Sequence, residues 1–125
     1  LLARARILSV AELAVDRVLA LTGSVDAARA ALARAGLTAD DIDLFEVNES
    51  FAALALHFAR HMEVGPDRLN VNGGAIALGH AMGSTGSALI GTALDELERR
   101  GARRALVAAC GAAGLASAMV LERVA

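Results

Sequence analysis

Apolar residues follow two kinds of spacing along this chain. Three segments carry an apolar side chain every three or four residues, which predicts helices over residues 24–35, 51–62 and 84–100. Four shorter apolar runs predict strands over residues 6–10, 42–47, 104–109 and 116–122. The segment Ala11–Ala20 is apolar with charges interspersed, and its spacing assigns it to neither class.

Turn residues at the ends of these segments support the assignment. Ser24 is placed to cap the first helix, and Gly36 and Gly101 follow the first and third helices as C-terminal glycines. The turn Gly111–Gly114 is too short for a crossover, so the last two strands should be antiparallel. Strands that alternate with helices and end in a hairpin predict an α/β layered domain with a mixed sheet.

The third helix has a clear apolar side. We expect its apolar residues to face the core, namely Leu89, Ala93, Leu94 and Leu97. We expect its charged residues to face water, namely Asp95, Glu96, Glu98, Arg99 and Arg100. In the first helix, the apolar stripe consists of Val25, Ala28, Ala31 and Leu32.

Composition narrows the class of protein. At 125 residues the chain is expected to form one domain, and 56% of its residues are hydrophobic. The net charge of −2, with mixed signs, argues against a nucleic-acid partner, which would need a basic patch. Cys110 is the only cysteine, so no internal disulfide forms and a reducing, cytoplasmic location is expected. No apolar run reaches the ~18 residues of a membrane span, so no membrane partner is expected.

The stretch Asn70–Gly91 holds six of the 12 glycines, with His80 in its middle. So many glycines together indicate a loop that needs positive φ or a close approach of the backbone to a ligand. Two phosphate-binding patterns fail here. The glycines at 79, 83 and 86 do not have the dinucleotide spacing, and no lysine follows the last of them as a P-loop requires.

Three polar residues stand at corresponding places, each after an apolar strand or within a glycine-rich turn: Asn48, His80 and Cys110. If the strands are neighbours, these residues gather at one edge of the sheet, where open α/β sheets bind ligands. Simpler interpretations exist for each alone: a helix cap for Asn48 with Glu49, a structural loop histidine, and a buried small cysteine.

A metal site is not expected. His57 and His61 lie one helical turn apart, but no third ligand is evident, and Phe58 stands where a zinc-protease helix has its glutamate. We interpret both histidines as surface or half-buried helix residues.

Three strings together resemble the C-terminal domain of the thiolases, the acetyl-CoA acetyltransferases and 3-ketoacyl-CoA thiolases. They are Asn48-Glu49-Ser50-Phe51-Ala52, the glycine-rich string from Asn70 to His80, and Cys110 with its small-residue turn. The resemblance extends from about residue 4 to 124. It implies a layered thiolase-like fold, a mixed sheet with helices packed on it. Residues 1–125 would form one of the two thiolase halves, with the N-terminal nucleophile domain absent from the chain.

The resemblance also implies roles for the three polar residues. Asn48 matches the asparagine that holds a catalytic water, and His80 matches the histidine that activates the nucleophilic cysteine and contributes to an oxyanion hole. Cys110 matches the acid/base that moves a proton at the α-carbon of the acetyl group. The residues expected to contact substrate or the oxyanion are Gly79, Ala112, Gly74 and Phe51. Coenzyme A thioesters would be the substrates, without a further cofactor.

This sequence departs from the family in four respects. The acyl-accepting cysteine of thiolases lies in their N-terminal half, so the expected partners are that missing half and further copies in a homo-oligomer. Ala81 replaces the usual proline after the histidine, and Ala112 replaces a glycine, which strains the backbone if positive φ is needed there. Residues 20–24 depart from the family motif before the first long helix. The alternative is a thiolase-fold protein without catalysis, which binds acyl-CoA or lipid or pairs with a partner.

Overall fold

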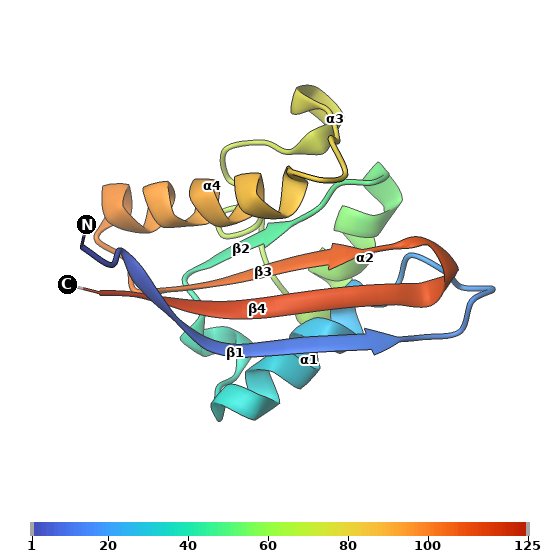
Figure 1. Cartoon of the computed structure of the whole chain (residues 1–125), viewed down its shortest axis with the longest axis horizontal. Coiled ribbons are helices and arrows are strands. Elements are labelled where there is room, and N and C mark those ends of the chain that lie inside the picture. Colours follow the sequence, from blue (N-terminus) through green and yellow to red (C-terminus); the bar gives the residue numbers. More distant parts are fainter. Residues whose placement is uncertain (1, 125) are drawn as a thin grey trace.

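A mixed four-stranded sheet is the centre of the fold (Figure 1). The structure is a computed structural model that describes residues 2–124. The strands are β1 (Ala5–Ala14), β2 (Leu44–Val47), β3 (Arg104–Cys110) and β4 (Leu115–Arg123), in the order β1-β4-β3-β2. β4 pairs antiparallel with both β1 and β3, whereas β2 pairs parallel with β3. The predicted mixed sheet and the antiparallel closing hairpin are therefore confirmed.

Helices cover both faces of this sheet. The α-helices are α1 (Ser24–Ala35), α2 (Ala52–Met62), α3 (Ala75–Leu78) and α4 (Thr85–Arg100), and the 3₁₀ turns are η1 (Ala39–Asp41) and η2 (Ala112–Gly114). Figure 1 shows α1 and α4 on opposite sides of the strands. Within residues 2–124, no helix combines the length and apolarity needed to cross a membrane.

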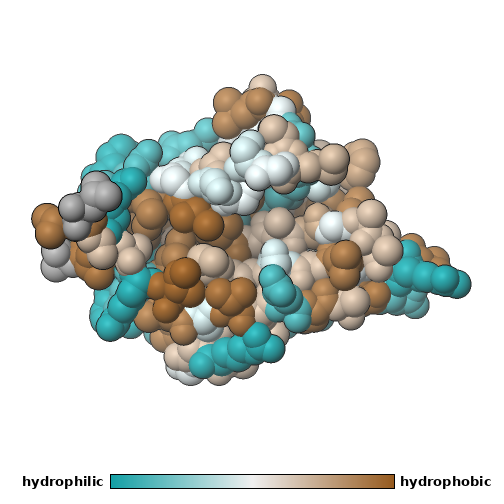
Figure 2. All heavy atoms as spheres, viewed as in Figure 1, coloured by the Kyte–Doolittle hydropathy of each residue, from teal (hydrophilic) through white to brown (hydrophobic). Residues whose placement is uncertain are grey.

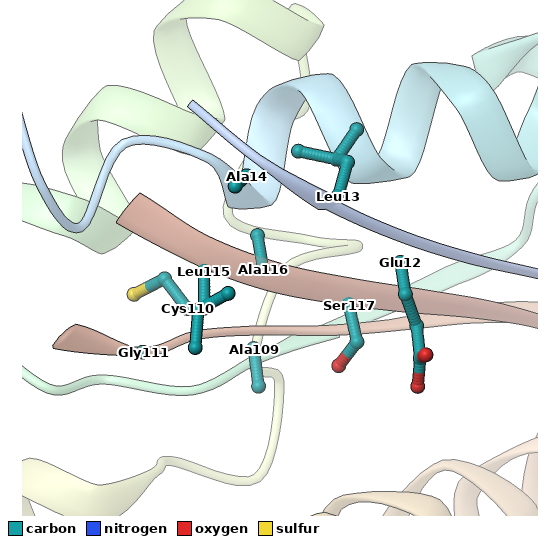
Figure 3. Close-up of a pocket in the computed structure, with 9 residues that line it drawn as sticks. All are labelled: Glu12, Leu13, Ala14, Ala109, Cys110, Gly111, Leu115, Ala116 and Ser117. Atoms are coloured by element: carbon teal, nitrogen blue, oxygen red, sulfur yellow. The ribbon is translucent and has the colours of Figure 1, made fainter. Parts of the chain in front are cut away.

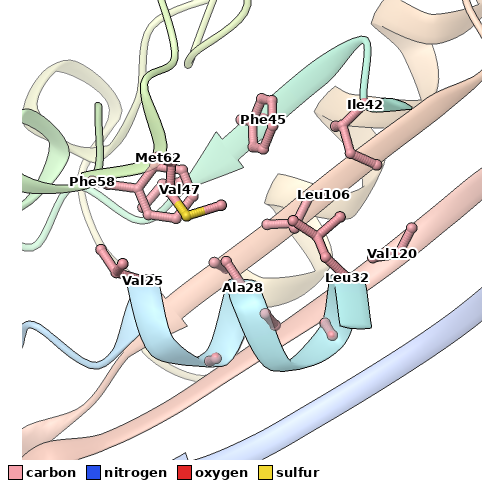
Figure 4. Packing of buried hydrophobic residues seen from close by; sticks show 14 of the residues in the cluster. Val25, Ala28, Leu32, Ile42, Phe45, Val47, Phe58, Met62, Leu106 and Val120 are labelled. Carbon is pink, nitrogen blue, oxygen red and sulfur yellow. The ribbon is translucent and has the colours of Figure 1, made fainter. Parts of the chain in front are cut away.

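The larger core lies between α1, α2 and the sheet. In Figure 4, Val25, Ala28 and Leu32 project from α1 toward the sheet and α2. Phe58 of α2 packs against Phe45 of β2, with the ring centroids 6.0 Å apart. The apolar stripe predicted for α1 is thus buried, as expected from its spacing.

A second core lies under α4, and one prediction about that helix is wrong. Leu89, Ala93 and Leu97 are buried as predicted. Glu96, expected to face water, is only 2% exposed. Its carboxylate accepts hydrogen bonds from Arg99 Nε at 2.7 Å and Asn72 Nδ2 at 3.1 Å, and it pairs with Arg100. These donors lower the pKa of Glu96 to about 2, with the Arg99 hydrogen bond as the largest cause. Burial of this charge is possible because it is paired.

Several boundaries differ from the sequence prediction. β1 continues to Ala14 instead of stopping at residue 10, because it pairs with β4 over its whole length. The second helix begins at Ala52 and the last at Thr85, and the short α3 was not predicted. The cap of α1 is Gly23 and Ser24 is the first helical residue, so the prediction that Ser24 caps this helix is wrong. Gly36 and Gly101 do end their helices in the left-handed region, at φ 67° and 65°.

Apolar side chains remain on the surface. Figure 2 shows brown apolar atoms beside teal polar ones on the face that Figure 1 views. β1 is an edge strand, and its Ile7 and Val10 are 60% and 40% exposed. Phe51, which follows the end of β2, is 64% exposed.

Candidate active site

The end of the sheet where β2 and β3 terminate brings two of the predicted residues together. Val47 pairs with Ala108 in the parallel register, so Asn48, which follows β2, and Cys110, which ends β3, lie at the same edge. The Asn48 backbone N–H continues the ladder by donating to Ala108 O at 2.9 Å. The carboxyl ends of neighbouring parallel strands are the usual place for a ligand in open α/β sheets.

A serine that the sequence analysis did not single out connects them. Asn48 Nδ2 donates to Ser50 Oγ at 2.9 Å, and Ser50 Oγ lies 4.0 Å from Cys110 Sγ. Asn48 is 1% exposed, and its Oδ1 has no hydrogen-bond partner among residues 2–124. A buried acceptor without a protein partner is a place for a water or a ligand donor.

Cys110 borders a cavity of about 590 Å³. Residues of β1, β3 and β4 line it, and Figure 3 shows Cys110 beside Leu115, with Glu12 and Ser117 on neighbouring strands. Burial raises the pKa of the Cys110 thiol above its ordinary value, and the Ser50 hydroxyl partly opposes this. Burial is the larger of these two effects.

His80 lies on the loop between α3 and α4 and is exposed. Thr85 Oγ1 donates to Ala81 O at 2.9 Å, so it accepts the hydrogen bond from His80 Nδ1 at 2.8 Å. In the neutral ring this leaves Nε2 as a free acceptor. Among residues 2–124, no hydrogen bond joins His80 to Asn48 or Cys110, so these polar residues form two separate groups.

Glu49 anchors the glycine-rich loop that carries His80. Its Oε1 accepts from Asn70 Nδ2 and its Oε2 from the Ile76 backbone N–H, both at 3.1 Å. The Asn70 side chain also bonds the backbone N–H and C=O of Val47 at 2.7 and 2.9 Å. The interpretation of Asn48 and Glu49 as a helix cap is therefore wrong. α2 begins only at Ala52, and the Glu49 carboxylate accepts hydrogen bonds from the loop instead.

The other predicted site residues lie around this edge. Gly74 and Gly79 line a small cavity of about 70 Å³ together with Glu46 and Thr85. Phe51 is at the surface. Ala112 is exposed in η2, and the strain expected there falls instead on its neighbour Ala113, which has φ 59°.

The two histidines of α2 are helix surface residues, as predicted. His57 is half-buried and His61 exposed, with ring centroids 4.2 Å apart. Burial lowers the pKa of His57, and the neighbouring His61 adds to this effect. Within residues 2–124, no cluster of three or more metal-binding side chains includes them.

Comparison with known proteins decides the family. The chain matches the family model described as thiolase, C-terminal domain, over residues 1–123. The chain belongs to the thiolase family. It is 45% identical to the steroid 3-ketoacyl-CoA thiolase FadA6 of Mycobacterium tuberculosis, over 96% of this chain and 30% of that protein. It is 44% identical to the acetyl-CoA acetyltransferase of Paracoccus denitrificans, over 95% of this chain and 30% of that one.

A solved thiolase structure has the same fold. The crystal structure of the Bacillus anthracis acetyl-CoA acetyltransferase superimposes with a TM-score of 0.95 at 31% sequence identity. That match covers 99% of this chain and 32% of the crystallised one. The thiolase-like layered fold predicted from the sequence is therefore confirmed, and the chain spans about a third of the length of the thiolases it matches.

Proposed function

We propose that this chain forms the C-terminal part of a thiolase-type acyltransferase site, which interconverts acyl-CoA and acetyl-CoA with 3-ketoacyl-CoA and CoA. The observation that carries the proposal is the grouping of Asn48 and Cys110 at the ends of two parallel strands, with Asn48 Oδ1 unpaired. The substrates are coenzyme A thioesters, and no other cofactor takes part. An N-terminal thiolase half completes the site, and the complete enzyme is a homo-oligomer.

In the first half-reaction, a cysteine of the N-terminal half attacks the acyl-CoA carbonyl, and the CoA thiolate leaves and is protonated. His80 serves as the base that takes the proton of that cysteine, because its Nε2 is the free ring nitrogen. The imidazolium then has an N–H at Nε2 that can donate to the thioester oxygen. The proton therefore moves from the cysteine to Nε2, and the imidazolium then passes it to the departing CoA thiolate.

In the second half-reaction, the Cys110 thiolate removes an α-proton from acetyl-CoA. The resulting enolate attacks the acyl-enzyme carbonyl, which forms the C–C bond and expels the N-terminal cysteine as a thiolate. A water held by Asn48 Oδ1 donates to the enolate oxygen, and this role suits a buried acceptor without a protein partner. An α-proton is acidic enough for removal only when that oxygen is stabilised.

The test is a chimaera in which this chain replaces the matching C-terminal segment of the Paracoccus denitrificans acetyl-CoA acetyltransferase, to which it is 44% identical. The chimaera should cleave acetoacetyl-CoA in the presence of CoA. The 125-residue chain alone should not, because its single cysteine is assigned to the acid/base role. A folded chimaera without activity would favour the alternative, a thiolase-fold chain that binds acyl-CoA or lipid, or pairs with a partner, without catalysis.

A further inference from the structure

Ser50 stands between the two residues to which the proposed function assigns the second half-reaction. Its Oγ is 2.9 Å from Asn48 Nδ2 and 4.0 Å from Cys110 Sγ. Ser50 follows β2 by three residues, whereas Cys110 is 60 positions away along the chain. The contact therefore depends on the parallel pairing of β2 and β3.

The direction of each hydrogen bond follows from the donors available. The Asn48 amide nitrogen can only donate, so Ser50 Oγ accepts there. The single hydroxyl hydrogen of Ser50 then remains for Cys110 Sγ, which as a thiolate can only accept. In this arrangement Asn48 Oδ1 is turned away from Ser50 and stays unpaired.

We propose that Ser50 is a positioning residue of this site: it fixes the Asn48 amide so that Oδ1 is left without a protein partner and can accept from a water, and it donates a hydrogen bond that stabilises the Cys110 thiolate. This inference rests on the proposed function for its catalytic meaning, but the hydrogen bonds are a property of the chain itself. One hydroxyl thus serves both the water-binding amide and the thiol base.

The surroundings of Cys110 make the Ser50 hydroxyl important for ionisation of the thiol. The thiol is partly buried, and burial alone disfavours its ionised form. Glu12 is the one other titratable side chain among the residues that line the Cys110 cavity, and Figure 3 shows its carboxylate at the end of the cavity away from the Cys110 sulfur. Ser50 supplies the side-chain hydrogen bond that acts in the opposite direction to burial.

The test is the pH dependence of Cys110 alkylation by iodoacetamide in the 125-residue chain, where Cys110 is the only thiol. Circular dichroism and urea unfolding establish that each variant is folded. Ser50→Ala should shift the midpoint of the rate profile upward by ~0.5–1 pH unit, because the thiolate loses its donor. Ser50→Thr keeps the hydroxyl and should give the wild-type midpoint.

Ser117→Ala is the matched control. Ser117 lines the same cavity from β4 and is half-buried, yet among residues 2–124 it makes no hydrogen bond to Cys110. Its removal should leave the midpoint unchanged. A folded Ser50→Ala chain with the wild-type midpoint would overturn the inference, as would an equal shift in Ser117→Ala. Neither result would bear on whether the chimaera cleaves acetoacetyl-CoA, so the two proposals can fail separately.

Discussion

The carboxylate of Glu49 fills the space that a β-carbon on Gly74 would occupy. The same carboxylate holds Asn70 Nδ2 and the Ile76 N–H, so it joins the end of β2 to both sides of the loop. Close approach of a side chain, and not positive φ, is therefore what requires glycine at position 74.

Gly74→Ala should lower the free energy of unfolding by about 1–3 kcal/mol, because Glu49 must move and leave its donors unpaired. Urea denaturation of the 125-residue chain measures this. Gly83→Ala is the control, since nothing lies within 4 Å of a β-carbon there and its φ is not positive. Equal stabilities of the two variants would show that Glu49 does not hold the loop in this way.

The turn after Cys110 contains a strained alanine. Ala113 has φ 59°, a conformation that costs an L-residue roughly 1–2 kcal/mol and glycine almost nothing. Ala113→Gly should therefore stabilise the chain by about 0.5 kcal/mol after the entropy of the unfolded glycine is subtracted. Ala112→Gly, where φ is not positive, should destabilise it by a similar amount. Urea midpoints in the opposite order would contradict this account of the turn.

Glu46 is a buried carboxyl whose ionisation should oppose folding. Its side chain is 2% exposed, and burial, followed by the charges of Glu49 and Glu96, raises its pKa to about 7. In the unfolded chain the Glu46 side chain has its ordinary pKa of 4.5, so stability is full below that pH and falls as pH rises from there to about 7. Above about pH 7 the folded chain carries the full free-energy cost of holding an ionised Glu46 in its interior.

Glu46→Gln removes this titration. It should be nearly neutral in stability at pH 4.5 and stabilising at pH 8, by on the order of 2 kcal/mol. Thermal or urea unfolding at the two pH values measures the difference. Glu12→Gln, at an exposed position, should show no such change between the two pH values. A Glu46→Gln chain whose advantage does not grow with pH would mean that Glu46 is ionised at no cost in the fold.

The elements of this fold could be predicted because their patterns are local. The apolar stripe of α1, the terminal glycines Gly36 and Gly101, and the closing hairpin all follow from spacing within one segment. What could not be predicted depends on partners far along the chain. β1 is longer than its own sequence suggests because β4 pairs with it to Ala14, and Glu96 is buried because Asn72 and two arginines surround its carboxylate.

In the candidate site, too, the residues could be predicted from local motifs, whereas their contacts could not. The motifs identified the family and predicted Asn48, His80 and Cys110, which stand at strand ends or in the glycine loop. The contacts among them are tertiary. Ser50 Oγ contacts Cys110 Sγ only because β2 pairs with β3. Glu49 accepts a hydrogen bond from the Ile76 N–H only because the loop folds back on β2. Residue type gave no sign of either contact.

The most direct test of the proposed function is the exchange of the acetyl-CoA methyl protons with solvent deuterium, catalysed by the chimaera and followed by mass spectrometry. Acetyl transfer to the N-terminal cysteine, measured from CoA release, is the control for a folded site. Cys110→Ala should retain that transfer and slow the exchange by about 10²–10⁴-fold, because the base at the α-carbon is lost. Exchange at the wild-type rate in Cys110→Ala would contradict the assignment of Cys110 as the base.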